Sequence, residues 1–132
     1  MINPVHRAVG AMQVNVVRAS QLAIKDAWKM SSDPFCRLHF GNLKERTKTV
    51  QRDLNPIWNE TFAFSLDEDK EWLLRDLVVN VWDDDFGGIS SDFLGEVPIL
   101  DSLLDGAAVN FFLVPETNMN TMVLRLKFQC GY

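Results

Sequence analysis

A series of short segments in which apolar and polar residues alternate constrains the fold of this chain most strongly. Residues 12–17 (MQVNVV) are an example. A period of two is typical of a β-strand with one buried face. Turn signals separate the segments, including NP at 55–56, GG at 87–88 and residues 115–120. The predicted strands are residues 12–17, 34–40, 46–50, 57–66, 77–82, 93–100, 109–114 and 121–128.

Strands at this spacing, without long helices between them, predict an all-β fold, an eight-stranded antiparallel β-sandwich. Residues 67–76 and 101–105 interrupt the alternation, and we expect short helical turns at most in both. The chain has 132 residues, 47% of them hydrophobic, which suits one domain with a single core.

Composition and charge narrow the classes of function. No run reaches the ~18 apolar residues of a membrane span, and residues 1–10 lack the apolar centre of a signal peptide, so we expect a cytoplasmic protein. Cys36 and Cys130 are too few to indicate a disulfide framework. The net charge of −5 argues against general affinity for nucleic acid, which needs a basic surface.

The most distinctive segment is residues 79–95 (VNVWDDDFGGISSDFLG), where an apolar run leads three carboxylates into a Gly-Gly turn that returns to Asp92. In an extended chain Asp83 and Asp85 share one side, while Asp84 points away. Two unit charges about 4 Å apart repel by about 4 kcal/mol at an effective dielectric constant near 20. Carboxylates that converge here therefore destabilise the domain unless a cation relieves them.

Alternating strand directions place the loops after the first, third and fifth predicted strands at one end of the sandwich, with both termini at the other. We expect five aspartates to meet at that rim: Asp26, Asp33, Asp83, Asp85 and Asp92. Only oxygen ligands lie in these loops, which disfavours zinc and copper, and an irregular carboxylate cup favours calcium over magnesium. The alternative is a solvated acidic loop without metal.

Five segments carry a resemblance to a known family: SDPF at 32–35, TKTV at 47–50, LNPIWNE at 54–60, VWDDD at 81–85 and DFLG at 92–95. Together they resemble the C2 domains, over residues 11–130, with residues 1–10 as an N-terminal extension. The resemblance implies an eight-stranded sandwich that binds two or three Ca2+ ions at its loop tips and docks on anionic phospholipid such as phosphatidylserine. The strand order resembles the type II permutation of phospholipase C and the novel protein kinases C.

Carried over to this sequence, the family's calcium ligands are Asp26, Asp33, Asp83, Asp85 and Asp92. The resemblance implies further ligands from the backbone carbonyls of Ala27 and Asp84, and from Ser90 or Ser91. The first and third loops each hold one residue more than most relatives. The number of ions and the register of Asp92 therefore stay open.

Four apolar residues lie among polar neighbours at the same rim: Trp28, Met30, Phe86 and Ile89. Burial of each in a lipid interface would contribute about 1.5–3 kcal/mol, and Trp prefers that boundary. We expect them to insert into the membrane, Trp28 foremost. The alternative is that they fold back onto the bases of their loops.

Basic residues share strand faces: Arg46 and Lys48 on the third predicted strand, and Arg37 and His39 on the second. With Trp82 and Ser91 they resemble the phosphoinositide groove of some C2 domains, although Phe35 stands where an aromatic hydroxyl is often found. A solvated strand face is the alternative; His39 is expected to be only a surface residue.

The sequence therefore predicts a calcium-dependent phospholipid-binding module that targets a larger polypeptide in signalling or membrane trafficking. We expect a monomer, recruited peripherally to membranes when calcium rises, with no catalytic activity of its own. An enzyme using paired carboxylates is disfavoured because no nucleophile–base pair accompanies them. The alternative function is a calcium-independent protein–protein interaction module.

Overall fold

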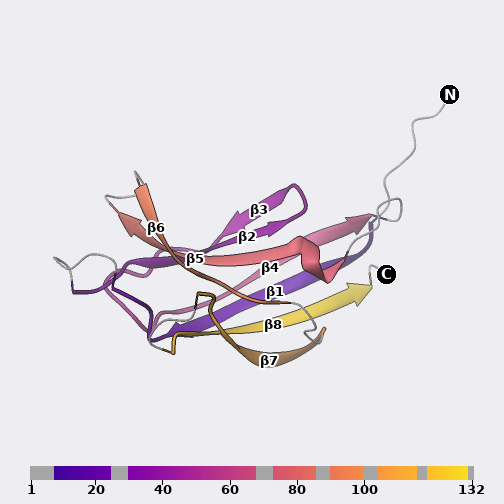
Figure 1. Cartoon of the computed structure of the whole chain (residues 1–132). Coiled ribbons are helices and arrows are strands. Elements are labelled where there is room, and N and C mark those ends of the chain that lie inside the picture. Colours follow the sequence, from indigo (N-terminus) through magenta and orange to yellow (C-terminus); the bar gives the residue numbers. More distant parts are fainter. Residues whose placement is uncertain are drawn as a thin grey trace.

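The structure, a computed structural model, describes residues 8–24, 30–67, 73–85, 90–99, 104–115 and 119–130. These residues form two packed four-stranded antiparallel sheets (Figure 1). One sheet has the order β4-β1-β8-β7 and the other β3-β2-β5-β6. The strands are β1 (Ala8–Ser20), β2 (Pro34–Phe40), β3 (Leu43–Arg46), β4 (Ile57–Asp67), β5 (Leu77–Asp85), β6 (Ser90–Glu96), β7 (Asp105–Phe112) and β8 (Thr121–Cys130).

The predicted all-β sandwich of eight strands is thus confirmed. The type II permutation stays a prediction, as does the domain boundary after residue 10; strand β1 begins at Ala8. A short 3₁₀ helix, η1 (Leu74–Asp76), lies within the first segment predicted as a helical turn. Most of the second such segment falls outside the described residues. The described part of the chain contains no helix long and apolar enough to cross a membrane.

The core lies between the sheets because every second residue of the central strands points inward. Strands β1 and β8 bury Met12, Val14, Val16, Met122, Leu124 and Leu126; strands β2 and β5 bury Cys36, Leu38, Val79 and Val81. Each fully buried aliphatic side chain contributes about 1.5–3 kcal/mol relative to exposure. This alternation is the pattern from which the sequence predicted the strands.

Strand β6 and the residues after β7 bring the two sheets together at one edge. A β-bridge pairs Glu96 with Val114, and each backbone N–H donates to the other carbonyl, at 2.8 and 2.9 Å. Gly95 permits the close approach, since a Cβ there would lie 2.9 Å from the Cβ of Leu113. The apolar run after residue 92 therefore pairs with β5 through Glu96 and then closes the sandwich.

The predicted boundaries of the third strand were wrong. Strand β3 ends at Arg46 instead of beginning there. The reason is Thr47, which is only 2% exposed and whose Oγ1 accepts a hydrogen bond from the Cys36 N–H at 2.9 Å. A side-chain oxygen therefore takes the bond that a strand carbonyl would otherwise accept. Lys48 lies beyond β3, so it does not share a strand face with Arg46.

The acidic residues also differ from the prediction, since they belong to strands and not to a loop. Strand β5 continues through Asp85, and β6 begins at Ser90 instead of residue 93. The ladder pairs Asp83 with Asp92 and Asp85 with Ser90. Only residues 86–89 remain between the strands, and they lie outside the described part of the chain. The carboxylates are therefore held by paired strands, next to a register shift between Val81 and Trp82.

One end of the sandwich collects the ends of strands from both sheets, at the left of Figure 1. There Ser20 of β1 pairs with Thr121 of β8, which pairs with Phe112 of β7. In the other sheet Pro34 of β2 pairs with Asp83. We call this end the rim. The first residues of β1 and the last of β8 lie at the opposite end, where Gly10 pairs with Cys130.

Candidate metal centre and adjoining basic face

Three aspartates converge at the rim. One carboxylate oxygen from each of Asp83, Asp85 and Asp92 lies within 4.8 Å of the others. Alternation along β5 turns Asp83 and Asp85 to the same face, and the β5–β6 ladder sets Asp92 opposite Asp83. Strand geometry and register together make the cluster.

Asp83 is the buried member of this cluster, 0% exposed, while Asp85 is half-buried and Asp92 exposed. The Oδ1 of Asp83 accepts a hydrogen bond from the backbone N–H of Asp33 at 2.7 Å. A buried carboxylate is costly unless it is hydrogen-bonded, paired with a charge or bound to a metal. The arrangement fits a cation held between β5 and β6.

Asp33 joins three segments of the rim. Its backbone carbonyl accepts from the Asp84 N–H at 2.9 Å, and its Oδ1 accepts from the Arg52 N–H at 2.7 Å. The Asp33 carboxylate is not one of the three that converge. The sequence placed it among the ligands, and the structure sets it at the same rim with one oxygen directed to the segment before β4.

Backbone hydrogen bonds tie the remaining rim segments to one another. The Leu22 N–H donates to the Leu54 carbonyl and the Asp53 N–H to the Ser32 carbonyl, both at 3.0 Å. The Ser32 hydroxyl donates to the Ala23 carbonyl at 2.8 Å. These bonds hold the segments on either side of residues 25–29 against the segment before β4. Hydrogen bonds between these segments therefore stabilise the rim on which the three aspartates lie.

The donor set selects the class of metal. The cluster offers carboxylate oxygens only, whereas zinc sites are usually built with His or Cys. Calcium accepts six to eight oxygens in irregular geometry, including bidentate carboxylates. The residues present therefore fit a calcium ion. Ser90 and Ser91 lie beside them, paired with Asp85 and Asp84.

Several residues that the sequence placed at the rim lie outside the described residues: Asp26, Ala27, Trp28, Phe86 and Ile89. Met30, the described member of the apolar set, is 71% exposed at the end of its loop and has a φ of 52°. Met30 is therefore an exposed apolar side chain, and its insertion into a membrane stays a prediction.

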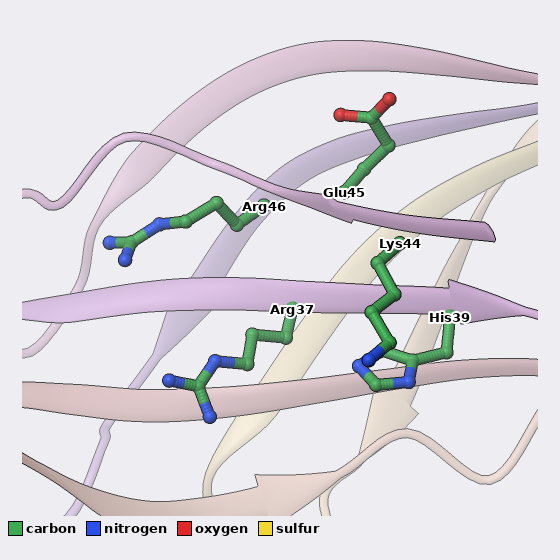
Figure 2. A pocket seen from close by; sticks show the side chains of 5 residues that line it. All are labelled: Arg37, His39, Lys44, Glu45 and Arg46. Atoms are coloured by element: carbon green, nitrogen blue, oxygen red, sulfur yellow. The ribbon is translucent and has the colours of Figure 1, made fainter. Parts of the chain in front are cut away.

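A basic face adjoins the rim on the outer side of β2, β3 and β5. Strand register sets Arg37 directly opposite Arg46 and His39 directly opposite Lys44. These residues and Glu45 line a hollow of about 400 Å³. Figure 2 shows the two arginines extending in the same direction from neighbouring strands, while Glu45 points away from them. Four basic side chains thus share one face of a chain whose net charge is −5.

Two aromatic rings form the floor of the basic face. The guanidinium carbon of Arg46 lies 3.8 Å from the ring centroid of Phe35, and that of Arg37 lies 4.7 Å from the ring centroid of Trp82. Phe93 packs edge-on against Trp82 at 5.3 Å. Cation–π contacts of this kind favour an ordered guanidinium. These contacts therefore favour one position for each guanidinium group.

The sequence reasoning found Arg37, Arg46 and Trp82 but missed two contributors to this face. Lys44 enters through the hairpin that pairs Phe40 with Leu43, which the Gly41–Asn42 dipeptide between two strand-like runs could have indicated. For Phe35 the sequence analysis noted only the missing hydroxyl. In the structure its ring is 1% exposed and packs against the guanidinium group of Arg46. Lys48 does not line the hollow; its backbone N–H donates to Glu60 Oε2 at 2.9 Å.

The sequence is similar to those of known proteins whose names refer to C2 domains or to synaptotagmin. The mouse multiple C2 and transmembrane domain-containing protein 2 is 42% identical over 100 residues, which cover 74% of this chain and 11% of that protein. Human extended synaptotagmin-3 is 32% identical over 124 residues, covering 90% of this chain and 13% of its own length. The chain thus spans only a small part of these relatives.

Solved structures give the same fold. A C2 domain of plant extended synaptotagmin 1 superimposes with a TM-score of 0.75 at 24% identity, covering 96% of this chain and 98% of that one. The family model for the C2 domain matches residues 10–112. The chain therefore belongs to the C2 domain family.

Proposed function

We propose that this C2 domain targets a larger polypeptide to anionic phospholipid membranes in a calcium-dependent manner, with residues 11–130 as the domain. The observation that carries the proposal is the convergence of Asp83, Asp85 and Asp92, whose oxygens lie within 4.8 Å of one another. Carboxylates so close repel one another when no cation is bound. A function in cation binding accounts for an arrangement that is otherwise unfavourable.

The proposed ligands are Asp26, Asp33, Asp83, Asp85 and Asp92, with the carbonyls of Ala27 and Asp84 and a hydroxyl of Ser90 or Ser91 completing the shell. Two or three calcium ions would suit this number of oxygens. Calcium bound there would supply positive charge and open coordination positions for the phosphate oxygens of a lipid such as phosphatidylserine. The aspartates by themselves repel anionic headgroups, so the rim would bind these headgroups only when calcium is bound.

Apolar residues at the rim would add the hydrophobic part of membrane binding. The exposure of Met30 supports this role, and we extend it to Trp28, Phe86 and Ile89 on their sequence positions. Each inserted side chain would contribute about 1.5–3 kcal/mol to binding. We therefore propose peripheral recruitment from the cytoplasm, by a monomeric domain, when calcium rises.

Phosphoinositides are the second proposed class of lipid. Arg37, Arg46, His39 and Lys44 share the basic face, and the hollow of about 400 Å³ lies among them. Arginine binds phosphate through paired N–H donors, and its charge attracts an anionic headgroup. The face adjoins the rim, so a single lipid surface can engage both.

The test is liposome sedimentation combined with calcium calorimetry. The wild-type domain is expected to show calcium heat and to sediment with phosphatidylserine liposomes in calcium but not in chelator. The Asp83→Asn, Asp85→Asn variant should fold and lose both responses. Asp67→Asn is the control, because Asp67 lies at the opposite end of the sandwich, paired with Ala8. Equal sedimentation of the wild type in chelator and in calcium would contradict the proposal, and would favour a calcium-independent interaction module.

A further inference from the structure

The guanidinium group of Arg46 is held at three points. It lies 3.8 Å above the ring centroid of Phe35, its Nε donates to the Thr47 carbonyl at 3.2 Å, and its Nη2 donates to the Thr49 hydroxyl at 3.0 Å. A guanidinium has five N–H groups, so these two bonds leave three N–H groups for a ligand. Arg46 therefore presents a fixed set of donors on the basic face.

Thr49 connects this arginine to strand β5, which carries two members of the aspartate cluster. Its Oγ1 accepts from Arg46 Nη2 and donates to Asp84 Oδ2 at 3.1 Å. A hydroxyl has one proton and two lone pairs, so the acceptor Asp84 fixes the proton and leaves a lone pair for the arginine. Both bonds therefore require the same orientation of the hydroxyl, so a displacement of Asp84 changes the hydrogen bond to Arg46.

Asp84 belongs to both sites by its position on β5. Its side chain turns to the basic face, while its neighbours Asp83 and Asp85 turn to the other face, where they form the aspartate cluster with Asp92. Its backbone N–H donates to the Asp33 carbonyl at 2.9 Å. Its Oδ1 is buried without a hydrogen-bond partner among the described residues, so Thr49 is the contact that positions this carboxylate.

We propose that Thr49 is a positioning residue that couples the carboxylate rim to the basic face. This rests on the proposed function, since it assumes that the rim holds calcium and that the face holds the phosphates of an inositol headgroup. A cation that fixes Asp83 and Asp85 also fixes Asp84 between them. Asp84 then holds the Thr49 hydroxyl, and the hydroxyl holds Arg46 in place for phosphate.

Coupling of this kind is reciprocal. If calcium tightens headgroup binding by a factor, the headgroup tightens calcium binding by the same factor. Part of any such factor comes from simple charge neutralisation, which does not depend on Thr49. The part carried by Thr49 is isolated by a variant that keeps every charge and the shape of the side chain. Thr49→Val does this, and Thr49→Ser keeps the hydroxyl as the matched control.

The experiment is a calorimetric titration of soluble inositol trisphosphate, in chelator and in saturating calcium. The measured quantity is the factor by which calcium tightens headgroup binding. We expect Thr49→Val to lower this factor about fivefold or more, which is the lower end of the usual range for coupling between two sites. Calcium affinity without headgroup should stay unchanged, and Thr49→Ser should restore the wild-type factor.

A second variant approaches the relay from its other end. Asp84→Ala keeps the backbone groups of residue 84 and removes the acceptor of the Thr49 proton. Because this variant also removes a charge, the comparison is made within it: adding Thr49→Val to Asp84→Ala should change the factor little, since residues in one hydrogen-bond network are not additive. Additive losses, or a factor in Thr49→Val equal to that of the wild type, would overturn the relay.

The two proposals fail in different ways. A wild-type domain without calcium heat refutes the proposed function. A wild-type domain that binds calcium, but whose headgroup affinity is absent or independent of Thr49, refutes only the relay. Inorganic phosphate in place of the headgroup tests the source of the anion. If calcium tightens the binding of inositol trisphosphate but not of phosphate, the inositol headgroup is supported as the ligand. If calcium tightens the binding of both by the same factor, that assignment is overturned.

Discussion

Arg37 and Arg46 lie directly opposite each other on β2 and β3, and both guanidinium groups lie over the ring of Phe35, with centroid distances of 5.2 and 3.8 Å. Like charges set directly opposite across a ladder are destabilising, by a few tenths of a kcal/mol to about 1 kcal/mol. The aromatic ring offsets part of this cost. An anion that binds both arginines would remove the rest.

This relationship predicts that soluble inositol trisphosphate raises the melting temperature of the wild-type domain. The rise should be largely lost in the Arg37→Gln, Arg46→Gln variant, because charge-assisted bidentate hydrogen bonds from arginine to phosphate are among the strong ones. Differential scanning fluorimetry measures both. Lys127→Gln is the control, since Lys127 lies on β8 of the other sheet. An equal rise in all three proteins would place the anion elsewhere.

The carboxylate cluster predicts a gain in stability from removing one charge. Without calcium, Asp85→Asn should raise the free energy of unfolding, because it removes the repulsion between Asp85 and the other two carboxylates. The gain should be only about 1 kcal/mol, because Asp85 is partly exposed and solvent screens the repulsion. In saturating calcium the order should reverse, since a bound ligand at one hundred times its dissociation constant stabilises the folded state by about 2.7 kcal/mol. Urea unfolding with calcium and with chelator measures both differences. A variant less stable than the wild type in chelator would contradict the prediction.

Thr47 predicts a stability difference between two substitutions of similar size. Thr47→Val removes the acceptor of the buried Cys36 N–H and should cost about 1–3 kcal/mol. Thr47→Ser keeps the hydroxyl and loses only a methyl group, at about 1 kcal/mol or less. Chemical denaturation measures the two free energies of unfolding. If the serine variant were the less stable, the methyl group and not the hydrogen bond would hold this segment.

Cys36 predicts a dependence of stability on alkaline pH. Burial, and after it the nearby carboxylate of Glu60, raises the pKa of the Cys36 thiol well above its usual range. Because the folded-state pKa is the higher one, its contribution is fully present below the unfolded pKa of about 8.5 and is lost as pH rises toward the folded value. The free energy of unfolding should therefore fall above pH ~8.5, less steeply in Cys36→Ala. Equal slopes in the two proteins would contradict this.

The sequence by itself determined the strands and their buried faces. The alternation in residues 12–17 is local, and it already separates inward Met12, Val14 and Val16 from their outward neighbours. The same local rule turned Asp83 and Asp85 to one side. The aspartate spacing and the oxygen-only donor set therefore indicated a hard cation before any tertiary structure was known.

Tertiary structure decided which residues of different strands lie opposite one another. The opposition of Asp92 to Asp83 depends on the register of β5 with β6, and that of Lys44 to His39 on the register of a hairpin. The end of β3 depends on the hydrogen bond from the Cys36 N–H to the Thr47 hydroxyl. The position of Arg46 depends on the ring of Phe35 and on the hydroxyl of Thr49, which in turn donates to Asp84. Alternation along one strand does not say which residue of the neighbouring strand lies opposite, and a one-residue change of register would turn every side chain of a strand to the other face. Side-chain hydrogen bonds such as those of Thr47 and Thr49 leave no periodic signal in the sequence.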